Sequence, residues 1–311
     1  MSRLTKGYLI ALTAITIWST TGILIDYLIS HYDMPALLLS FWRNVLVCIA
    51  LVPPLAIIRR SLLRIERAHL RFFVFYGVVL ALFNSIWTLS VQENGAGVAT
   101  VLGYSSAGFT AIFAWWIFKE RLGVFKITAI CLSLTGCVLV ANAYDPEMWN
   151  LKLLGVTTGL LSGVLFASYN MMAKEATKRG INAWTSLLYS FAFGAVFILI
   201  FNFLPLPGAA GSVAAIPPDL PSDGWLVLIV LSFIPTLLGY GLYNTSMHYL
   251  PASVASLLAT IEPLMTSVEA YLLLGERMTM VQVIGSVLIV LGVIVMRFEK
   301  EEPSVLVASA A

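Results

Sequence analysis

The chain has 311 residues, of which 59% are hydrophobic and 11% are charged, and it carries a formal net charge of +2. Soluble domains carry roughly 25% charged residues, so there is too little polar surface here to cover a water-soluble globule. The small net charge also gives no reason to expect a nucleic-acid partner. The composition therefore predicts a protein that lies in a lipid bilayer.

Ten apolar runs are each long enough to form a helix across a bilayer, which needs about 20 residues. The runs lack the alternating pattern of membrane β-barrel strands and are about twice too long for such strands. The first run is also too long for a signal peptide, so we interpret it as an uncleaved helix. The sequence predicts an all-α membrane protein with ten transmembrane helices over residues 7–29, 35–58, 72–91, 95–117, 124–142, 152–173, 184–204, 225–247, 252–273 and 279–296.

Lys and Arg in the connecting loops predict the orientation, because cytoplasmic loops hold the excess of basic residues. If the N-terminus is inside, the outer loops receive only Lys152 and Arg277, and the other basic loop residues face the cytoplasm. We therefore expect a multi-pass protein of the cell inner (plasma) membrane with both termini in the cytoplasm. The proline-rich segment 205–224 is then a flexible outer loop.

An internal repeat appears at an offset of 156 residues. Glu120-Arg121, after the fourth predicted helix, matches Glu276-Arg277 after the ninth, and the register holds without gaps over this region. Chance similarity between two apolar stretches is the alternative, because Leu and Val matches are frequent in such stretches.

Each half of the repeat holds five predicted helices, an odd number, so the second half enters the membrane from the opposite side. We expect a first repeat at 1–142, a second at 143–297 and a short cytoplasmic tail at 298–311. Inverted repeats are typical of secondary transporters, whose substrate site lies near the bilayer midplane between the repeats.

Short motifs in both halves carry a family resemblance. They are Trp18-Ser19, Arg43-Asn44, the stretch 243–252, Glu262-Pro263-Leu264 and Gly275-Glu276-Arg277. Over about residues 7–297 the chain resembles the EamA type of the drug/metabolite transporter superfamily. The resemblance implies ten helices, a central cavity and the export or exchange of small organic solutes. Where that family often has a proline in the fourth helix, this chain has Ser106-Ala107-Gly108.

Four charged residues, Asp26, Arg43, Glu262 and Glu269, fall inside predicted helices. A charge at the bilayer centre costs roughly 2.5–3.5 kcal/mol, so it usually faces a cavity or a partner. We expect Arg43 to form a buried ion pair with Glu269 or Asp26, which makes these three an intramembrane charge network. Asp26 lies near the outer interface, where solvation by water is the alternative.

Glu262 is predicted to lie about 15 Å from the cytoplasmic end of the ninth helix, near the midplane. Pro263 cannot donate a backbone hydrogen bond, so it frees a carbonyl at the same level. An acid beside a broken helix suits a site for a proton or an amine. The alternative is that Glu262 is protonated or bonds to nearby backbone, and only maintains the kink.

The remaining candidates are aromatic or uncharged polar residues near the middle of the bilayer, away from the interfacial belts of Trp and Tyr. With Glu262 they predict a mostly apolar cavity with few polar groups, as is usual for small-molecule sites. Helix–helix packing is the alternative for each of them. The predicted cavity residues are Trp18, Asn84, Tyr104, Ser106, Tyr240, Asn244 and Glu262.

Motifs of other functions are missing from the sequence. It has no GxxxxGK[ST] loop, so no ATP-driven pump is indicated. It has no HExxH or GxSxG motif, and its cysteines lack metal-ligand spacing, so we expect no enzyme, no metal site and no cofactor. The sequence predicts a secondary transporter that moves a small organic solute, such as an amino acid, an amine or another metabolite or drug, by alternating access. Protons are a candidate coupling ion, the oligomeric state is open, and a non-transporting receptor or scaffold is the alternative.

Overall fold

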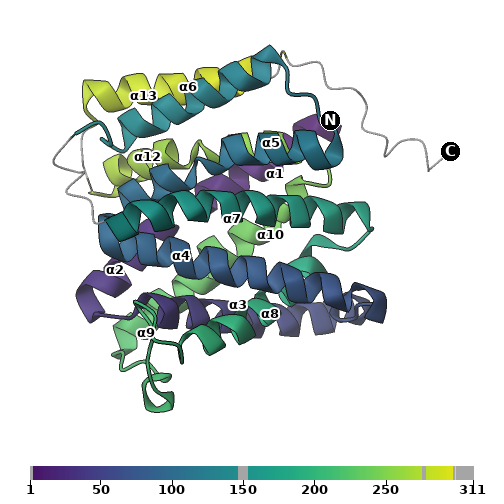
Figure 1. Cartoon of the computed structure of the whole chain (residues 1–311), viewed down its shortest axis with the longest axis vertical. Coiled ribbons are helices and arrows are strands. Elements are labelled where there is room, and N and C mark those ends of the chain that lie inside the picture. Colours follow the sequence, from purple (N-terminus) through teal and green to yellow (C-terminus); the bar gives the residue numbers. More distant parts are fainter. Residues whose placement is uncertain (1–2, 146–152, 275–277, 297, 299–311) are drawn as a thin grey trace.

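The computed structural model describes residues 3–145, 153–274, 278–296 and 298, and its regular elements there are all helices (Figure 1). Short η helices lie at Arg60–Leu63, Arg67–His69 and Val213–Ala215, and a π-helix, η5 (Ser232–Gly239), joins α9 to α10. The α-helices are α1 (Arg3–Trp18), α2 (Thr21–Tyr32), α3 (Ala36–Ile58), α4 (Leu70–Gly103), α5 (Ser106–Phe118), α6 (Val124–Val140), α7 (Leu153–Lys178), α8 (Ala183–Phe201), α9 (Ser222–Leu231), α10 (Tyr240–Ser246), α11 (Ala252–Ala259), α12 (Glu262–Leu274) and α13 (Met280–Met296).

Several helices have the length and composition of membrane spans. α6 and α13 are apolar but shorter, with 17 residues each. Large apolar side chains such as Phe75 and Trp116 remain exposed, and a bilayer would cover them. Within the described residues, the six stretches long and apolar enough to cross a membrane are Arg3–Tyr32, Ala36–Ile58, Arg67–Glu93, Gly95–Phe118, Ala183–Phe201 and Ser222–Ser246.

Three of the predicted spans are broken near their middle. The first breaks between α1 and α2, the fourth between α5 and the part of α4 that follows the non-helical Gly95, and the ninth between α11 and α12. At each break a side-chain hydroxyl donates a hydrogen bond to the carbonyl three residues earlier. The donors are Ser19, Ser105 and Thr260, with oxygen–oxygen distances of 2.7, 2.7 and 2.6 Å. Such bonds compete with the helical backbone bonds and favour a helix end.

Pro263 has a different role from the one expected. It is the second residue of α12, in the first helical turn, where its missing N–H leaves no helical bond unmade. The break before it lies at Thr260 and Ile261. The proline therefore starts a helix rather than kinking one.

Helix lengths repeat along the chain. α5 and α12 have 13 residues each, and Ser106 and Glu262, their first residues, are 156 positions apart. α6 and α13 have 17 residues each, and their first residues, Val124 and Met280, have the same offset. The breaks before α5 and α12 therefore correspond as well. The predicted match of Glu276-Arg277 lies outside the described residues.

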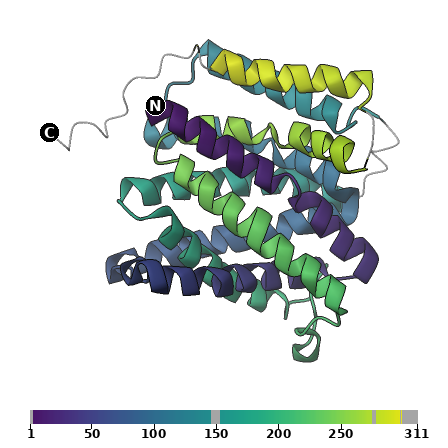
Figure 2. The same ribbon diagram turned by 180° about the vertical axis from the view of Figure 1, so that it is seen from behind.

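The repeated helices α6 and α13 pack side by side at one edge of the molecule (Figures 1 and 2). They run antiparallel, because Gln282 at the start of α13 bonds to the carbonyl of Val140 at the end of α6. Farther along α13, Gly292 lies against Ser133. A Cβ atom added to Gly136 would meet the carbonyl oxygen of Gly285 at 2.5 Å, so the backbones touch.

α3 and α8 lie at the opposite edge of the bundle, and α4 packs on both α7 and α8 (Figure 1). Seen from behind, α1 and α2 lie beside the run from α9 to α10 (Figure 2). The largest fully buried side chains include Tyr76, Tyr169, Tyr243, Phe73 and Phe191. The core is therefore aromatic, and the rings come from both halves of the chain.

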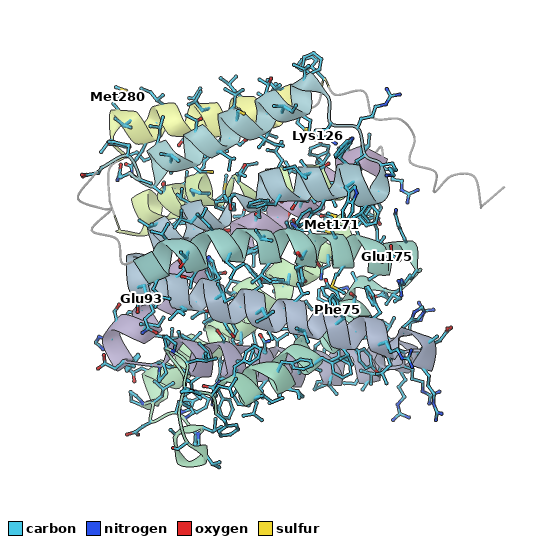
Figure 3. The ribbon with its side chains drawn as sticks, in the orientation of Figure 1. Phe75, Glu93, Lys126, Met171, Glu175 and Met280 are labelled. Carbon is cyan, nitrogen blue, oxygen red and sulfur yellow. The ribbon has the colours of Figure 1, made fainter. Side chains whose placement is uncertain are left out.

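The predicted orientation can be tested on the two ends of the bundle, where Figure 3 places Glu93 and Met280 at one end and Glu175 at the other. A membrane-impermeant maleimide should label a Ser212→Cys variant in intact cells and leave a Ser61→Cys variant unlabelled. Ser212 and Ser61 are both exposed, so any difference reports sidedness. The exposed Cys131 is replaced by Ala in both variants. Labelling at position 61 with protection at position 212 would reverse the orientation.

Candidate functional site

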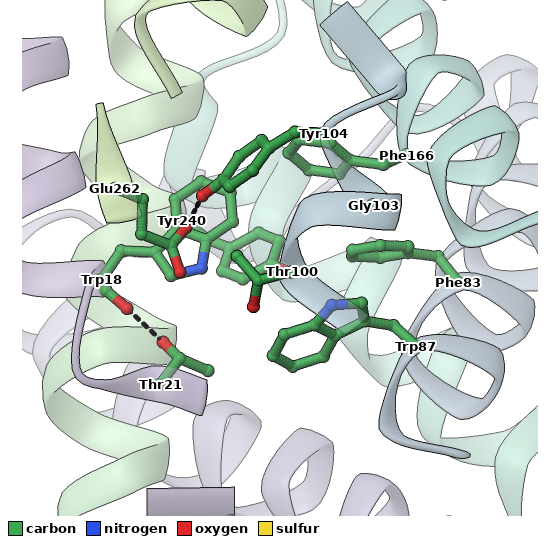
Figure 4. A pocket seen from close by; sticks show the side chains of 10 residues that line it. All are labelled: Trp18, Thr21, Phe83, Trp87, Thr100, Gly103, Tyr104, Phe166, Tyr240 and Glu262. Atoms are coloured by element: carbon green, nitrogen blue, oxygen red, sulfur yellow. Dashed lines mark hydrogen bonds between the residues drawn. The ribbon is translucent and has the colours of Figure 1, made fainter. Parts of the chain in front are cut away.

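A small cavity of about 40 Å³ lies where the three broken helices meet (Figure 4). Its lining is mostly aromatic and comes from α1, α2, α4, α7, α10 and α12. The lining residues are Trp18, Thr21, Phe83, Trp87, Thr100, Gly103, Tyr104, Phe166, Tyr240 and Glu262.

Glu262 is the acidic residue in this lining, and only 5% of its surface is exposed. It opens α12, where the backbone N–H groups of a helix start favour negative charge. The hydroxyl of Tyr104, at the break between α4 and α5, donates a hydrogen bond to its Oε2. The two corresponding breaks thus face each other across the cavity, and a phenol from one meets a carboxylate from the other.

Aromatic rings surround this carboxylate. The ring centroid of Trp18 lies 4.9 Å from that of Tyr240 and 5.6 Å from that of Phe166. Phe166 in turn stacks on Phe83 with centroids 4.9 Å apart. A buried acid among aromatic faces is an arrangement that attracts an organic cation, because ring faces and carboxylate both carry negative potential.

Hydrogen bonds connect the break after α1 to α12 beside the cavity. The Ser19 hydroxyl, whose single proton is shared with the carbonyl of Thr16, lies 2.6 Å from Oε1 of Glu269, and Thr266 donates to the carbonyl of Ser19 at 3.0 Å. The other carboxylate oxygen of Glu269 is buried and has no hydrogen-bond partner in the described part of the chain. Glu269 therefore acts on the broken first span rather than on the cavity itself.

Four of the seven predicted cavity residues, Trp18, Tyr104, Tyr240 and Glu262, line this cavity, and three do not. Asn84 donates to Asn44 at 3.0 Å, and the amide nitrogen of Asn244 lies 2.8 Å from the hydroxyl of Tyr169. Ser106 is buried at the start of α5, outside the lining.

The sequence interpretation missed the other lining residues. Phe83 and Trp87 lie four positions apart on α4, a spacing that puts both on one helix face. Phe166 lies 148 positions after Trp18, the same offset as between Gly7 and Gly155, and the two rings are in contact. Helix spacing and repeat pairing were therefore the signals that could have found them.

Arg43 is 1% exposed, and its Nε and one terminal nitrogen, Nη2, have no hydrogen-bond partner within the described residues. The expected ion pair with Glu269 or Asp26 is not formed there. Glu269 bonds to Ser19 instead, and Asp26 is only half-buried. The intramembrane charge network predicted from the sequence is thus absent from the described residues.

Replacing Arg43 by Met is expected to keep or raise the stability of the protein. Met has a similar length and needs no hydrogen-bond partner, and replacing buried charge by apolar volume is often neutral or stabilising by about 1–4 kcal/mol. Thermal unfolding of the purified protein measures the effect, with the exposed Arg60→Met as the control. A large loss of stability for Arg43→Met alone would reveal a partner for the guanidinium.

Comparison with known proteins shows the family of this chain. The sequence pattern of the EamA-like transporter family matches residues 5–142 and 153–298. The chain belongs to this family. As an EamA-like transporter it moves a small molecule across a membrane and is not an enzyme.

Two relatives that match nearly the whole chain are also named as a transporter or an efflux pump. An Escherichia coli (strain K12) protein named a probable amino-acid metabolite efflux pump is 25% identical over 296 residues, which cover 94% of each chain. An uncharacterized inner membrane transporter of Salmonella typhimurium is 25% identical over 310 residues, covering 96% of this chain and 97% of that one. A solved crystal structure superposes with a TM-score of 0.75 at 16% identity, over 95% of this chain and 99% of that one, and shows that the fold is shared.

Proposed function

We propose that this EamA-like transporter carries a small organic amine with an apolar body, and that Glu262 meets the ammonium group. The observation that carries the proposal is the buried carboxylate of Glu262 within an aromatic lining. Cations are attracted to aromatic faces, and a charged hydrogen bond supplies orientation. The relatives named amino-acid metabolite efflux pumps support this substrate class and the direction of export, because amino acids carry an amine.

Alternating access is the mechanism that we propose, with ten spans in two inverted repeats at residues 1–142 and 143–297. The equal lengths of α5 and α12, and of α6 and α13, support the repeat. The cavity of about 40 Å³ is much smaller than the roughly 300–1,000 Å³ of small-molecule sites. Substrate therefore enters only after the helices around the breaks have moved apart.

A closed inner gate supports the same mechanism. At the end of the bundle predicted to face the cytoplasm, Lys174 donates to the carbonyls of Met247 and Leu250 at 2.8 and 2.7 Å. Lys126 lies 3.6 Å from the carboxylate of Glu120 and donates to Ser253 at 3.0 Å. The Lys174 bonds hold the segment between α10 and α11 against α7, and the Lys126–Ser253 bond holds the start of α11 against α6. Opening toward the cytoplasm requires that they break.

Binding of matched probes to the purified protein tests the substrate class. 2-Phenylethylamine should raise the unfolding temperature, whereas the neutral 2-phenylethanol should not, because a ligand stabilises the folded state according to its affinity. Uptake of labelled 2-phenylethylamine into proteoliposomes then separates a transporter from a receptor. Equal shifts of the unfolding temperature with both probes would show that the carboxylate of Glu262 does not recognise the substrate.

A further inference from the structure

A second pocket, of about 440 Å³, lies at the end of the bundle predicted to face the cytoplasm. It is formed by the segment between α3 and α4, the turn between α7 and α8, the start of α8 and the turn after α10. Its volume falls within the range of about 300–1,000 Å³ found for small-molecule sites. Unlike the central cavity, it is polar, and three arginines, Arg59, Arg64 and Arg179, line it together with one acidic residue, Glu66, whose carboxylate lies 3.8 Å from the ring of His69.

The three arginines differ in how far their charge is already balanced. Arg179 is paired with Glu175 at 2.9 Å and stacks over the ring of Phe72. Arg59 and Arg64 are exposed, and neither forms an ion pair with any residue in the part of the chain that the structure describes. Two guanidinium groups are therefore open to an anion in one pocket.

Neutral groups in the same wall also suit an anion. Asn182 caps the first turn of α8, a helix of 19 residues, so the positive end of that helix faces the pocket. Burial lowers the pKa of the His248 ring. The Nδ1 atom of His248 is buried and has no hydrogen-bond partner among the described residues.

Two exposed apolar residues directly precede Arg59 in the sequence. Ile57 and Ile58, at the end of α3 and just before Arg59, are 84% and 78% exposed. Exposed apolar side chains next to clustered arginines at a membrane surface suit a molecule with acyl chains and an anionic head. A soluble phosphate ester would contact the arginines but would not cover the isoleucine side chains.

We propose that this pocket binds the phosphate of an anionic phospholipid headgroup, with Arg59 and Arg64 as the contacts to the phosphate. Arg60 and Arg67 belong to the same segment but do not line the pocket. They contribute to the excess of cytoplasmic positive charge without contacting the lipid. The chain thus offers a matched control of equal charge.

Lipid titration of the protein in nanodiscs, followed by native mass spectrometry, tests the proposal. Phosphatidylglycerol should bind more tightly than phosphatidylcholine. The double variant Arg59→Gln and Arg64→Gln should lose about 25-fold in affinity for phosphatidylglycerol, at roughly five-fold per arginine. The control Arg60→Gln and Arg67→Gln should lose much less. Equal losses in the two double variants would mean diffuse surface attraction and would overturn the site.

Two further measurements distinguish loss of the site from a folding defect and from binding of a soluble phosphate ester. The double variant Arg59→Lys and Arg64→Lys keeps the charge and should recover most of the affinity, whereas a folding defect would not be rescued. Glycerol 3-phosphate, titrated in phosphatidylcholine nanodiscs, distinguishes the two sources of phosphate. Tight binding of this ester without a preference for phosphatidylglycerol would overturn the lipid assignment. No substrate is present in these titrations, so their failure leaves the proposed transport untouched.

Discussion

Replacing Glu262 by Gln is expected to weaken the binding of 2-phenylethylamine by roughly 10- to 150-fold, since a hydrogen bond to a charged group contributes about 1.5–3 kcal/mol. Gln keeps the size of the side chain and can still accept the hydrogen bond from Tyr104. The unfolding temperature should therefore change little. Uptake driven by an imposed pH gradient should be lost if this carboxylate exchanges its proton for the amine.

The matched control for this change is Glu269→Gln, a second acid on the same helix that lies outside the cavity. Its Gln side chain can still accept from Ser19, so affinity for the amine should stay within about three-fold of the wild type. Similar losses for both variants would indicate a general effect of charge. Unchanged affinity and pH-driven uptake for Glu262→Gln would leave Glu262 with a purely structural role.

Replacing Gly136 by Ala is expected to destabilise the protein by about 1–3 kcal/mol or more, since the new methyl group must fit into a tightly packed contact. Its Cβ would lie 2.5 Å from the carbonyl oxygen of Gly285 and 2.9 Å from the backbone nitrogen of Ile289. Backbone atoms cannot turn aside as a flexible side chain can. The helices α6 and α13 must therefore separate to admit the methyl group.

Thermal unfolding compares this variant with Gly97→Ala, where a Cβ atom would meet nothing within 4 Å. That control should be neutral or slightly stabilised, because Ala restricts the unfolded chain more than Gly does. An unfolding temperature for Gly136→Ala equal to that of the control would show that α6 and α13 are not held in this contact.

The sequence predicted which residues form helices better than it predicted which way each helix faces. Helices in a bilayer are apolar toward lipid and apolar toward one another, so hydropathy gives little information about rotation. Asn84 and Asn244 have the right depth for the cavity, yet they bond to Asn44 and Tyr169 inside the bundle. Arg43 likewise has the depth expected for an ion pair, but Glu269 bonds to Ser19 on another helix.

The predicted depth was right for two residues that lie at the breaks. Tyr104 and Glu262 were each placed near the midplane, and both line the cavity at corresponding breaks. The breaks themselves were only half predicted. Pro263 was taken as the cause of the break in the ninth predicted helix alone, whereas the hydroxyl bonds of Ser19, Ser105 and Thr260 are common to all three breaks. Such bonds form only after a local backbone bend, so a residue type alone does not reveal them.

The contact between α6 and α13 joins two segments that leave the ribosome at different times. At a synthesis rate of about 5–20 residues per second, α13 follows α6 by roughly 8–30 s. During that interval the nascent chain holds Gly136 and its neighbours without the helix that covers them in the finished bundle. Membrane insertion therefore has to protect α6 from other partners, and a chain that stops before Met280 is expected to become a substrate for quality-control proteolysis.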